Sequence, residues 1–266
     1  MKKTWGLLAV IVVALSSGAA SAGALELAAH RAFYALEIKN SRNSGFADVR
    51  GAVRVLRERS CDGWISEETV RMAVETDLGR VFEQGLHFTG WESFDGKNYS
   101  FASRSRSDAE RLESRGSARR GKEGDAGEVT YRLPNAQKQF LPPDTFFPSN
   151  LVTWVIAKAK AGEKRLQAHS FDGTNDDGAE LMVIYVGKEE AADTTGKSGD
   201  HELLSGQAWN VRFAAFALDS PAAEPSYEFK AKLIENGILA EAVLDFDEFT
   251  VLQRLVKIEK VDIPKC

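Results

Sequence analysis

The stretch Trp91–Phe101, WESFDGKNYSF, decides the fold class of this chain. Asp95-Gly96 stands between two runs that contain aromatic residues, and an Asp-Gly pair in that setting is the strongest short-range signal of a β-hairpin. Segments in which apolar and polar residues alternate as in strands occur on both sides of it, among them 32–39, 51–59, 181–188, 209–218 and 248–261. Because the loops between roughly a dozen such segments are short, we predict a mainly β chain built as an antiparallel sheet.

One segment has a helical pattern instead, FFPSNLVTWVIAKAKAGEK at 146–164. Pro148 suits the first turn of a helix and Gly162 suits the position just past its end, which predicts one main helix around 148–161. The residues that share one helical face by their spacing are Leu151, Trp154, Val155 and Lys158. We expect this face to pack against the sheet, with Trp154 as an anchor in the core.

The first 22 residues have the pattern of a Sec signal peptide. Lys2 and Lys3 precede a short apolar run at 7–15, and Ala20-Ser21-Ala22 is a small-x-small cleavage site. The apolar run is too short to span a bilayer, which disfavours the alternative of an uncleaved anchor. We therefore predict cleavage after Ala22, a single domain at 23–266, and a periplasmic protein that does not span the membrane.

Charge and cysteine content narrow the function further. The chain has 34 basic and 39 acidic residues, and its net charge of −5 becomes −7 once Lys2 and Lys3 leave with the signal peptide. Such a balance argues against nucleic-acid binding, which needs a basic surface. Its two cysteines are Cys61 and Cys266. In an oxidising compartment such a pair most simply forms one disulfide, with free or intermolecular thiols as the alternative.

No motif in the sequence indicates catalysis or metal binding. There is no G-x-S-x-G, and the four histidines lie far apart without H-E-x-x-H spacing. FDGTNDDG at 171–178 fails as an EF-hand, because Asp177 and Val183 stand where Gly and Glu are needed. We expect a turn with solvated carboxylates there, and we predict no enzymatic activity, no catalytic residue, no cofactor and no metal. His30 lies at the start of the first predicted strand, and its ring could pair with a carboxylate.

Two groups of residues are candidate contacts for a ligand. Arg115, Arg119 and Arg120 in RGSARRGK (115–122) would suit anionic lipid phosphates, or they form a solvated face that nearby glutamates balance. A set of aromatic residues could line an apolar concavity for an acyl chain, although core packing accounts for them with fewer assumptions. This set is Trp64, Phe82, Trp91, Phe94, Tyr99 and Phe101.

An ordered series of segments resembles the EipB family of periplasmic cell-envelope integrity proteins. The segments cover nearly the whole mature chain and are AHRAFYALEI (29–38), RGAVRVLRERSCDGW (50–64), GWESFDGKNYSF (90–101), RGSARR (115–120), LPPDTFFPSNLVTWVIAKAKAGEK (141–164), FDGTNDDG (171–178), EPSYEFKAKLIENGI (224–238) and LDFDEFTVLQRLVKIEKVDIPKC (244–266). The resemblance implies a coiled antiparallel sheet, a β-spiral similar to the LolA/LolB half-barrels, with a disulfide between Cys61 and Cys266. It also implies a tetratricopeptide-repeat protein as a periplasmic partner, and no catalytic activity.

These observations leave two hypotheses. The first is a non-enzymatic, monomeric periplasmic protein needed for envelope integrity and stress resistance, which binds a protein or an envelope component. The second is a periplasmic carrier of lipid or lipoprotein acyl chains in a LolA-like cavity. The helix at 148–161 separates them, because a helix that fills the concave face leaves no room for an acyl chain.

Overall fold

The computed structural model describes residues 26–42, 45–108, 110–218, 224–246 and 248–266. The predicted signal peptide, residues 1–22, lies outside these ranges. Within them, fifteen strands form one sheet, accompanied by one α-helix and one short 3-10 helix. The elements are β1 (His30–Ser41), β2 (Phe46–Arg59), β3 (Gly63–Thr76), β4 (Val81–Ser93), β5 (Asn98–Arg106), β6 (Arg111–Arg119), β7 (Gly127–Leu133), β8 (Gln137–Leu141), α1 (Pro148–Lys160), β9 (Arg165–Ser170), β10 (Glu180–Ala191), β11 (Ser198–Gly199), η1 (His201–Leu204), β12 (Gln207–Ala217), β13 (Tyr227–Ile234), β14 (Leu239–Asp245) and β15 (Phe249–Lys260).

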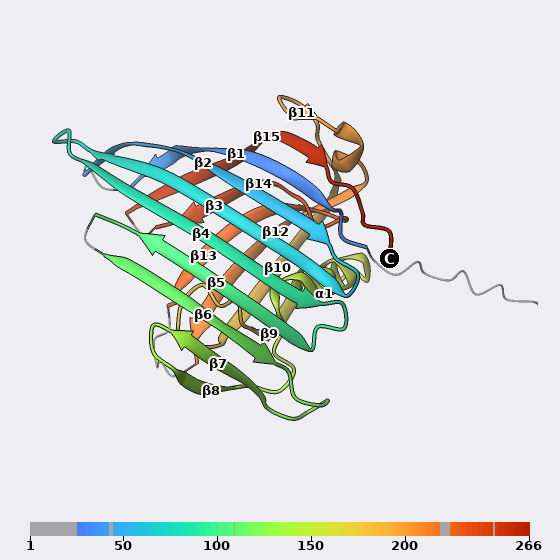
Figure 1. Ribbon diagram of the computed structural model, residues 1–266. Coiled ribbons are helices and arrows are strands. Elements are labelled where there is room, and N and C mark those ends of the chain that lie inside the picture. The colour runs from blue at the N-terminus through green and yellow to red at the C-terminus, as the bar shows by residue number, and fades with distance from the viewer. Residues whose placement is uncertain (1–25, 43–44, 109, 219–223, 247) are drawn as a thin grey trace, which may run out of the picture.

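The sheet is a long meander that coils on itself (Figure 1). Strands β1 to β8 lie side by side in sequence order, and β9, β10 and β12 to β15 form a second series. The two series join where β1 pairs with β15. Neighbours along this path are antiparallel, and the short β11 adds to β15 in parallel. The predicted mainly β fold with a coiled antiparallel sheet is therefore confirmed.

Alternating burial gives each strand an inner face and an outer face. In β1, Ala32, Tyr34 and Leu36 are buried, whereas the residues between them are partly exposed. The register places Tyr34 opposite Val53 of β2 and Leu255 of β15, both buried, so the inner faces of neighbouring strands coincide. A slip of one residue would turn a whole apolar set toward water, so burial fixes the register.

The two edge strands of the sheet, β8 and β9, are connected by the segment that carries α1. Phe146 in this segment forms a parallel bridge with Ser170 at the end of β9. The Phe146 amide donates to the His169 carbonyl at 2.8 Å, and the Phe171 amide donates to the Phe146 carbonyl at 3.0 Å. The backbone therefore ties the β8 side of the coil to the β9 side at this point.

α1 begins at Pro148 and ends at Lys160, which confirms the predicted helix. Gly162 follows the C-cap residue with φ +82°, a conformation that favours glycine and ends the helix. No helix in the described part of the chain combines the length and apolarity needed to cross a bilayer.

The buried face of α1 differs in part from the predicted one. Its buried residues are Ser149, Leu151, Val155, Ile156 and Ala159. Lys158, predicted on this face, is half-buried, and its Nζ pairs with Glu163 at 2.8 Å. Trp154 is also half-buried and packs at the edge of the face, with its ring centroid 5.1 Å from that of Phe146. The helix is thus turned so that a charged amine stays in water, which costs less than burying it.

The Asp95-Gly96 turn lies between β4 and β5 as predicted. Gly96 has φ +62°. The Asp95 carboxylate accepts hydrogen bonds from the Ser93 hydroxyl at 2.6 Å and from the Lys97 amide at 3.0 Å. An aspartate that bonds the backbone two residues ahead is a common way to fix a tight turn.

Candidate functional site

The concave face of the coil contains an open cavity of about 460 Å³, called the inner cavity below. It lies between the inner faces of β1 to β6 on one side and β14 and β15 on the other. Its apolar lining residues are Leu36, Val53, Val70, Met72, Leu86, Leu112, Leu244 and Phe246. The volume falls within the range of roughly 300–1,000 Å³ that is usual for small-molecule sites.

The opposite end of the interior, called the α1 end below, is filled by side chains. Ile156 and Val155 of α1 are fully buried there. They belong to one apolar cluster with residues of β3, β9, β10 and β12, including Trp64, Leu166, Ile184, Val211 and Phe213. α1 therefore fills one end of the concave face and leaves the inner cavity open at the other.

Glu92 of β4 joins the sheet to the N-terminus of α1. Glu92 is 2% exposed, and its carboxylate accepts hydrogen bonds from the amides of Ser149 at 2.6 Å and Asn150 at 3.0 Å. The Asn150 side-chain amide donates to the same carboxylate at 2.6 Å. The first amides of a helix have no hydrogen-bond partner within the helix, and they carry partial positive charge. A carboxylate accepts their hydrogen bonds and balances this charge. Phe147, the N-cap residue, makes no side-chain cap of its own.

A buried cation and a neutral histidine face each other near the α1 end. Arg57 of β2 is opposite His30 of β1. The Arg57 Nε and Nη1 atoms are buried and have no hydrogen-bond partner among the described residues. Burial lowers the pKa of Arg57, while Glu92 and Tyr34 act in the opposite direction.

His30 pairs with no carboxylate among the described residues, so the expected ion pair is not found there. Its Nδ1 lies 2.8 Å from the Ala28 carbonyl oxygen, which accepts the ring proton. Burial, and after it the positive charge of Arg57, lowers the pKa of His30 to about 4. The ring is therefore neutral at physiological pH, and the positive charge at this place belongs to Arg57.

Glu68 of β3 brings a carboxyl group to the inner cavity. Burial raises the pKa of Glu68, and the negative charge of Asp172 raises it further. A protonated carboxyl costs less to keep beside apolar groups than a carboxylate does. The inner cavity thus combines apolar with polar lining residues, among which Glu68 loses its charge more readily than an ordinary glutamate as the pH falls.

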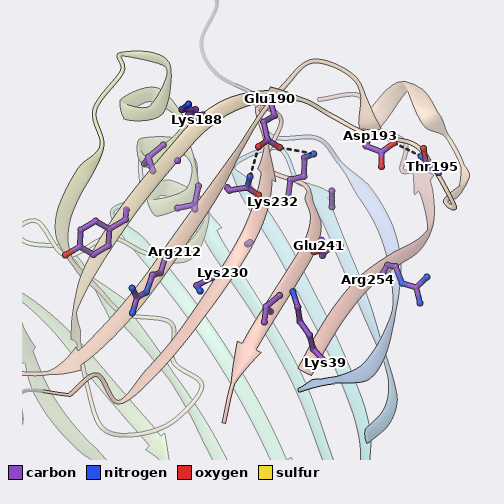
Figure 2. A pocket seen from close by; sticks show the side chains of 18 of the residues that line it. Lys39, Lys188, Glu190, Asp193, Thr195, Arg212, Lys230, Lys232, Glu241 and Arg254 are labelled. Atoms are coloured by element: carbon purple, nitrogen blue, oxygen red, sulfur yellow. Dashed lines mark hydrogen bonds and ion pairs between the residues drawn. The ribbon is translucent and has the colours of Figure 1, made fainter. Parts of the chain in front are cut away.

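A second hollow lies on the outer face of the sheet, over β10, β12 to β15 and the end of β1 (Figure 2). This hollow, called the outer groove below, has a volume of about 1010 Å³, and the segment 193–197 forms part of its wall. Its basic lining residues are Lys39, Lys164, Lys188, Lys197, Arg212, Lys230, Lys232 and Arg254, and its acidic ones are Glu190, Asp193 and Glu241. No pattern in the sequence pointed to this groove, because its members are spread over most of the chain.

The structure does not gather Arg115, Arg119 and Arg120 at one point. Arg115 and Arg119 are exposed on β6. Arg120 follows the strand and is half-buried, with Nη2 3.8 Å from Asp144 and its guanidinium 5.2 Å from the Phe146 ring centroid. Arg119 and Arg120 line a groove of about 600 Å³, whose lining does not include Arg115. Their contact with an anion stays a prediction.

The aromatic residues that were candidates for an acyl site are absent from the described lining of the inner cavity. Trp64, Tyr99 and Phe101 are core residues instead. The rings of Tyr99 and Phe147 stack with centroids 5.0 Å apart. The apolar lining residues of the cavity on β1 to β4 are Leu, Val and Met, and Phe246 is the aromatic residue of its described lining.

The acidic segment 171–178 is folded into the interior rather than extended into water. The Asp172 carbonyl accepts a hydrogen bond from the buried Tyr99 hydroxyl at 2.7 Å, and the Asn175 carbonyl accepts one from the Ser114 hydroxyl at 3.1 Å. Gly173 has φ +76°, and a Cβ there would meet the Phe101 ring. The predicted turn is present, but Asp172 and Asp176 are half-buried rather than fully solvated. The described residues contain no group of three or more His, Cys, Asp or Glu that could hold a metal ion.

Cys61 and Cys266 form a disulfide in the structure, with their Cα atoms 5.6 Å apart. Cys61 lies in the turn between β2 and β3, close in sequence to Trp64 of the α1-end cluster. The bond closes a loop over a sequence separation of 205. It therefore holds the segment after β15 at the α1 end of the coil, and the inner cavity is left without such a cross-link.

The fold defines a class of protein, a β-barrel-like protein whose single antiparallel sheet stays open between β8 and β9. A crystal structure of a β-barrel-like protein of a domain of unknown function from Brucella abortus is similar to it. The TM-score is 0.80 at 28% sequence identity, and the match covers 90% of this chain and 100% of that chain.

The model of the EipB-like family matches residues 21–262, so this chain belongs to the EipB-like family. The cell envelope integrity protein EipB of Brucella abortus (strain 2308) is 29% identical over 258 residues, which cover 94% of this chain and 90% of that protein. The family predicted from the ordered segments of the sequence is therefore confirmed.

Proposed function

We propose that this chain is a periplasmic protein that preserves the integrity of the cell envelope, and that it acts by binding rather than by catalysis. Its similarity along 94% of its length to a cell envelope integrity protein is the observation that carries the proposal. The disulfide between Cys61 and Cys266 agrees with an oxidising compartment.

The test is deletion of the gene in the source bacterium followed by growth in a membrane-damaging detergent. We expect the deletion strain to lose viability and the full-length chain to restore it. A chain without residues 1–22 should fail to restore it, because it stays in the cytosol. Equal viability of the deletion and parent strains would contradict the envelope role, and rescue by the truncated chain would contradict the periplasmic one.

A second candidate function, the carriage of lipid or lipoprotein acyl chains, is favoured by the inner cavity. α1 fills one end of the concave face, yet about 460 Å³ remains open beside Leu, Val, Met and Phe side chains. Burying a methylene group there would contribute about 0.8 kcal/mol, so a chain of several methylenes would be held without any directed contact. Glu68 would lie beside the bound chain, and its raised pKa lowers the cost of that neighbour.

Two adjacent residues of β3 give a matched test of the inner cavity. Val70 lines the cavity, whereas Arg71 is exposed on the outer face of the same strand. Val70→Phe should displace a fluorescent palmitate analogue from the purified protein, and Arg71→Phe should leave its binding unchanged. Native mass spectrometry of protein prepared without detergent should show bound lipid in the wild type and less in Val70→Phe. Equal binding by both variants would refute an acyl site in this cavity.

A further inference from the structure

The outer groove concentrates positive charge on a protein whose overall charge is negative. Eight basic and three acidic residues line it, in a chain with a net charge of −5. Four of the basic residues pair with carboxylates: Arg212 with Glu228, Arg254 with Glu37 at 2.9 Å, Lys232 with Glu190 at 3.4 Å, and Lys197 with Asp193 at 3.8 Å. Lys164 donates to the Gly187 carbonyl at 3.1 Å instead.

Three exposed lysines of the groove have no such partner. Lys39, Lys188 and Lys230 make no ion pair or side-chain hydrogen bond with any residue of the described ranges. They come from β1, β10 and β13, so unneutralised charge is spread across the groove rather than gathered at one edge (Figure 2). The groove therefore holds several separate cationic positions.

The strand register sets the charged residues of the groove floor in two rows. One row across four strands is Tyr185, Arg212, Lys230 and Val243, in which each residue is directly opposite the next. A second row, two residues along, is Asn210, Lys232, Glu241 and Arg254. Arg212 is paired with Glu228, so among the described residues Lys230 carries the unneutralised positive charge of the first row.

The side chains that point into the groove favour a hydrophilic anion over an apolar protein segment. Tyr185 and Val243 are the apolar or aromatic side chains on the two rows. The other apolar lining residues, Val186, Val211, Ala231 and Ala240, are buried and face the core. Protein interfaces rely on aromatic or aliphatic anchors that fill pockets, which this groove lacks apart from Tyr185. Lysine and arginine bind phosphate well, and several separate cations suit a ligand with several anionic groups.

We infer that the outer groove binds a phosphorylated oligosaccharide, with Lys39, Lys188 and Lys230 contacting its phosphate groups. The concave floor and the wall at 193–197 fit a chain that lies within the groove. Tyr185, whose side chain is at one end of the first row, offers a ring face and a hydroxyl to a sugar. This inference is independent of the proposed acyl site, because the two surfaces are on opposite faces of the sheet.

The test measures binding of lipopolysaccharide from which all acyl chains have been removed, a phosphorylated oligosaccharide, by isothermal titration calorimetry. Lys230→Glu and Lys188→Glu should each weaken binding at least tenfold, and the affinity should fall steeply as salt is added. Lys122→Glu is the matched control, because Lys122 is exposed in the turn between β6 and β7 and the charge change is the same. It should change the affinity less than twofold.

Four further arms decide between ligand classes and sites. The same oligosaccharide after chemical removal of its phosphates should bind at least tenfold more weakly. An acidic decapeptide of glutamate and vesicles of phosphatidylglycerol should not compete with it. Val70→Phe should bind it normally, which separates this groove from the inner cavity.

Equal weakening by Lys122→Glu, equal binding without phosphate, or competition by the peptide or the vesicles would overturn the inference. An unchanged melting temperature of Lys230→Glu and Lys188→Glu shows that a loss of binding is not a loss of folding.

Discussion

The two ends of the interior differ in what covers the inner face of the sheet. At the α1 end a helix covers the sheet, Glu92 binds the first amides of that helix, and the disulfide ties the chain down nearby. At the inner cavity no element of the described ranges covers the sheet in this way, and Leu112 and Phe246 are 54% and 40% exposed. The same coiled sheet thus provides a densely packed end and an end with room for a ligand. The difference teaches that the helix stabilises the fold without closing the whole concave face.

The largest expected effect tests the cross-link of the α1 end. Replacing Cys61 and Cys266 by serine should lower the free energy of unfolding by up to about 5 kcal/mol, since the bond closes a long loop of the unfolded chain. Each single variant and the reduced wild type should lose a similar amount in urea unfolding. A double variant that unfolds at the same urea concentration as the oxidised wild type would show that the α1 end does not depend on the bond.

The next effect tests the packing of α1. Ile156 is 0% exposed in the cluster of the α1 end, so Ile156→Ala should destabilise the protein by roughly 3 kcal/mol through lost burial and the resulting cavity. Thermal unfolding followed by circular dichroism measures this loss. A loss as small as that of a surface substitution would mean that the helix is not anchored to the sheet.

A third test uses the buried pair of His30 and Arg57. The pKa of His30 is about 4 in the folded protein against 6.5 in the unfolded chain. The folded state thus binds fewer protons, so stability is fully present above pH 6.5 and falls with pH until it has passed pH 4. The loss between pH 7.5 and pH 4 should be about 3 kcal/mol.

His30→Gln separates this contribution from those of other groups. The pKa of Glu68 is raised in the folded state, so Glu68 acts in the opposite sense and favours folding as the pH falls. The difference in urea-unfolding free energy between wild type and His30→Gln should therefore shrink toward acid pH. A difference that is constant from pH 7.5 to pH 4 would mean that His30 titrates alike in both states.

The smallest effect is expected at the inner cavity. Leu86 is half-buried and lines open space, so Leu86→Ala removes few contacts and should cost about 1 kcal/mol. Comparison with Ile156→Ala under the same conditions measures the contrast between the two ends directly. Equal losses for the two variants would show that the inner cavity is packed as tightly as the α1 end.

Local patterns in the sequence predicted the elements well. The Asp95-Gly96 turn, the alternation in 32–39 and the Pro148 and Gly162 signals each depend on a few neighbouring residues. The buried face of α1 was predicted less well. Leu151, Trp154, Val155 and Lys158 lie on one face by their spacing, but spacing alone does not show that the charged Lys158 stays at the surface. Only the packed helix shows that Ile156 and Ala159 replace Lys158.

The surfaces that could bind a ligand could not be predicted in the same way. Arg115, Arg119 and Arg120 are close in sequence, yet the strand and the turn after it orient them differently. Lys39, Lys188 and Lys230 are far apart in sequence, and the sheet register alone brings them into one groove. His30 likewise meets Arg57 through the pairing of β1 with β2. Long-range pairing of this kind leaves no local signal in the chain.

The pairing of β1 with β15 has a consequence for assembly. The first strand of the sheet finds one of its two partners in a strand that follows every other strand along the chain. β15 is the last strand to be synthesised, so β1 and β15 in the middle of the sheet stay unpaired until synthesis has passed residue 260. Contacts so distant along the polypeptide form slowly, because a long loop must close before they are made. The nascent chain therefore remains without the pairing of β1 with β15 for as long as it is being made.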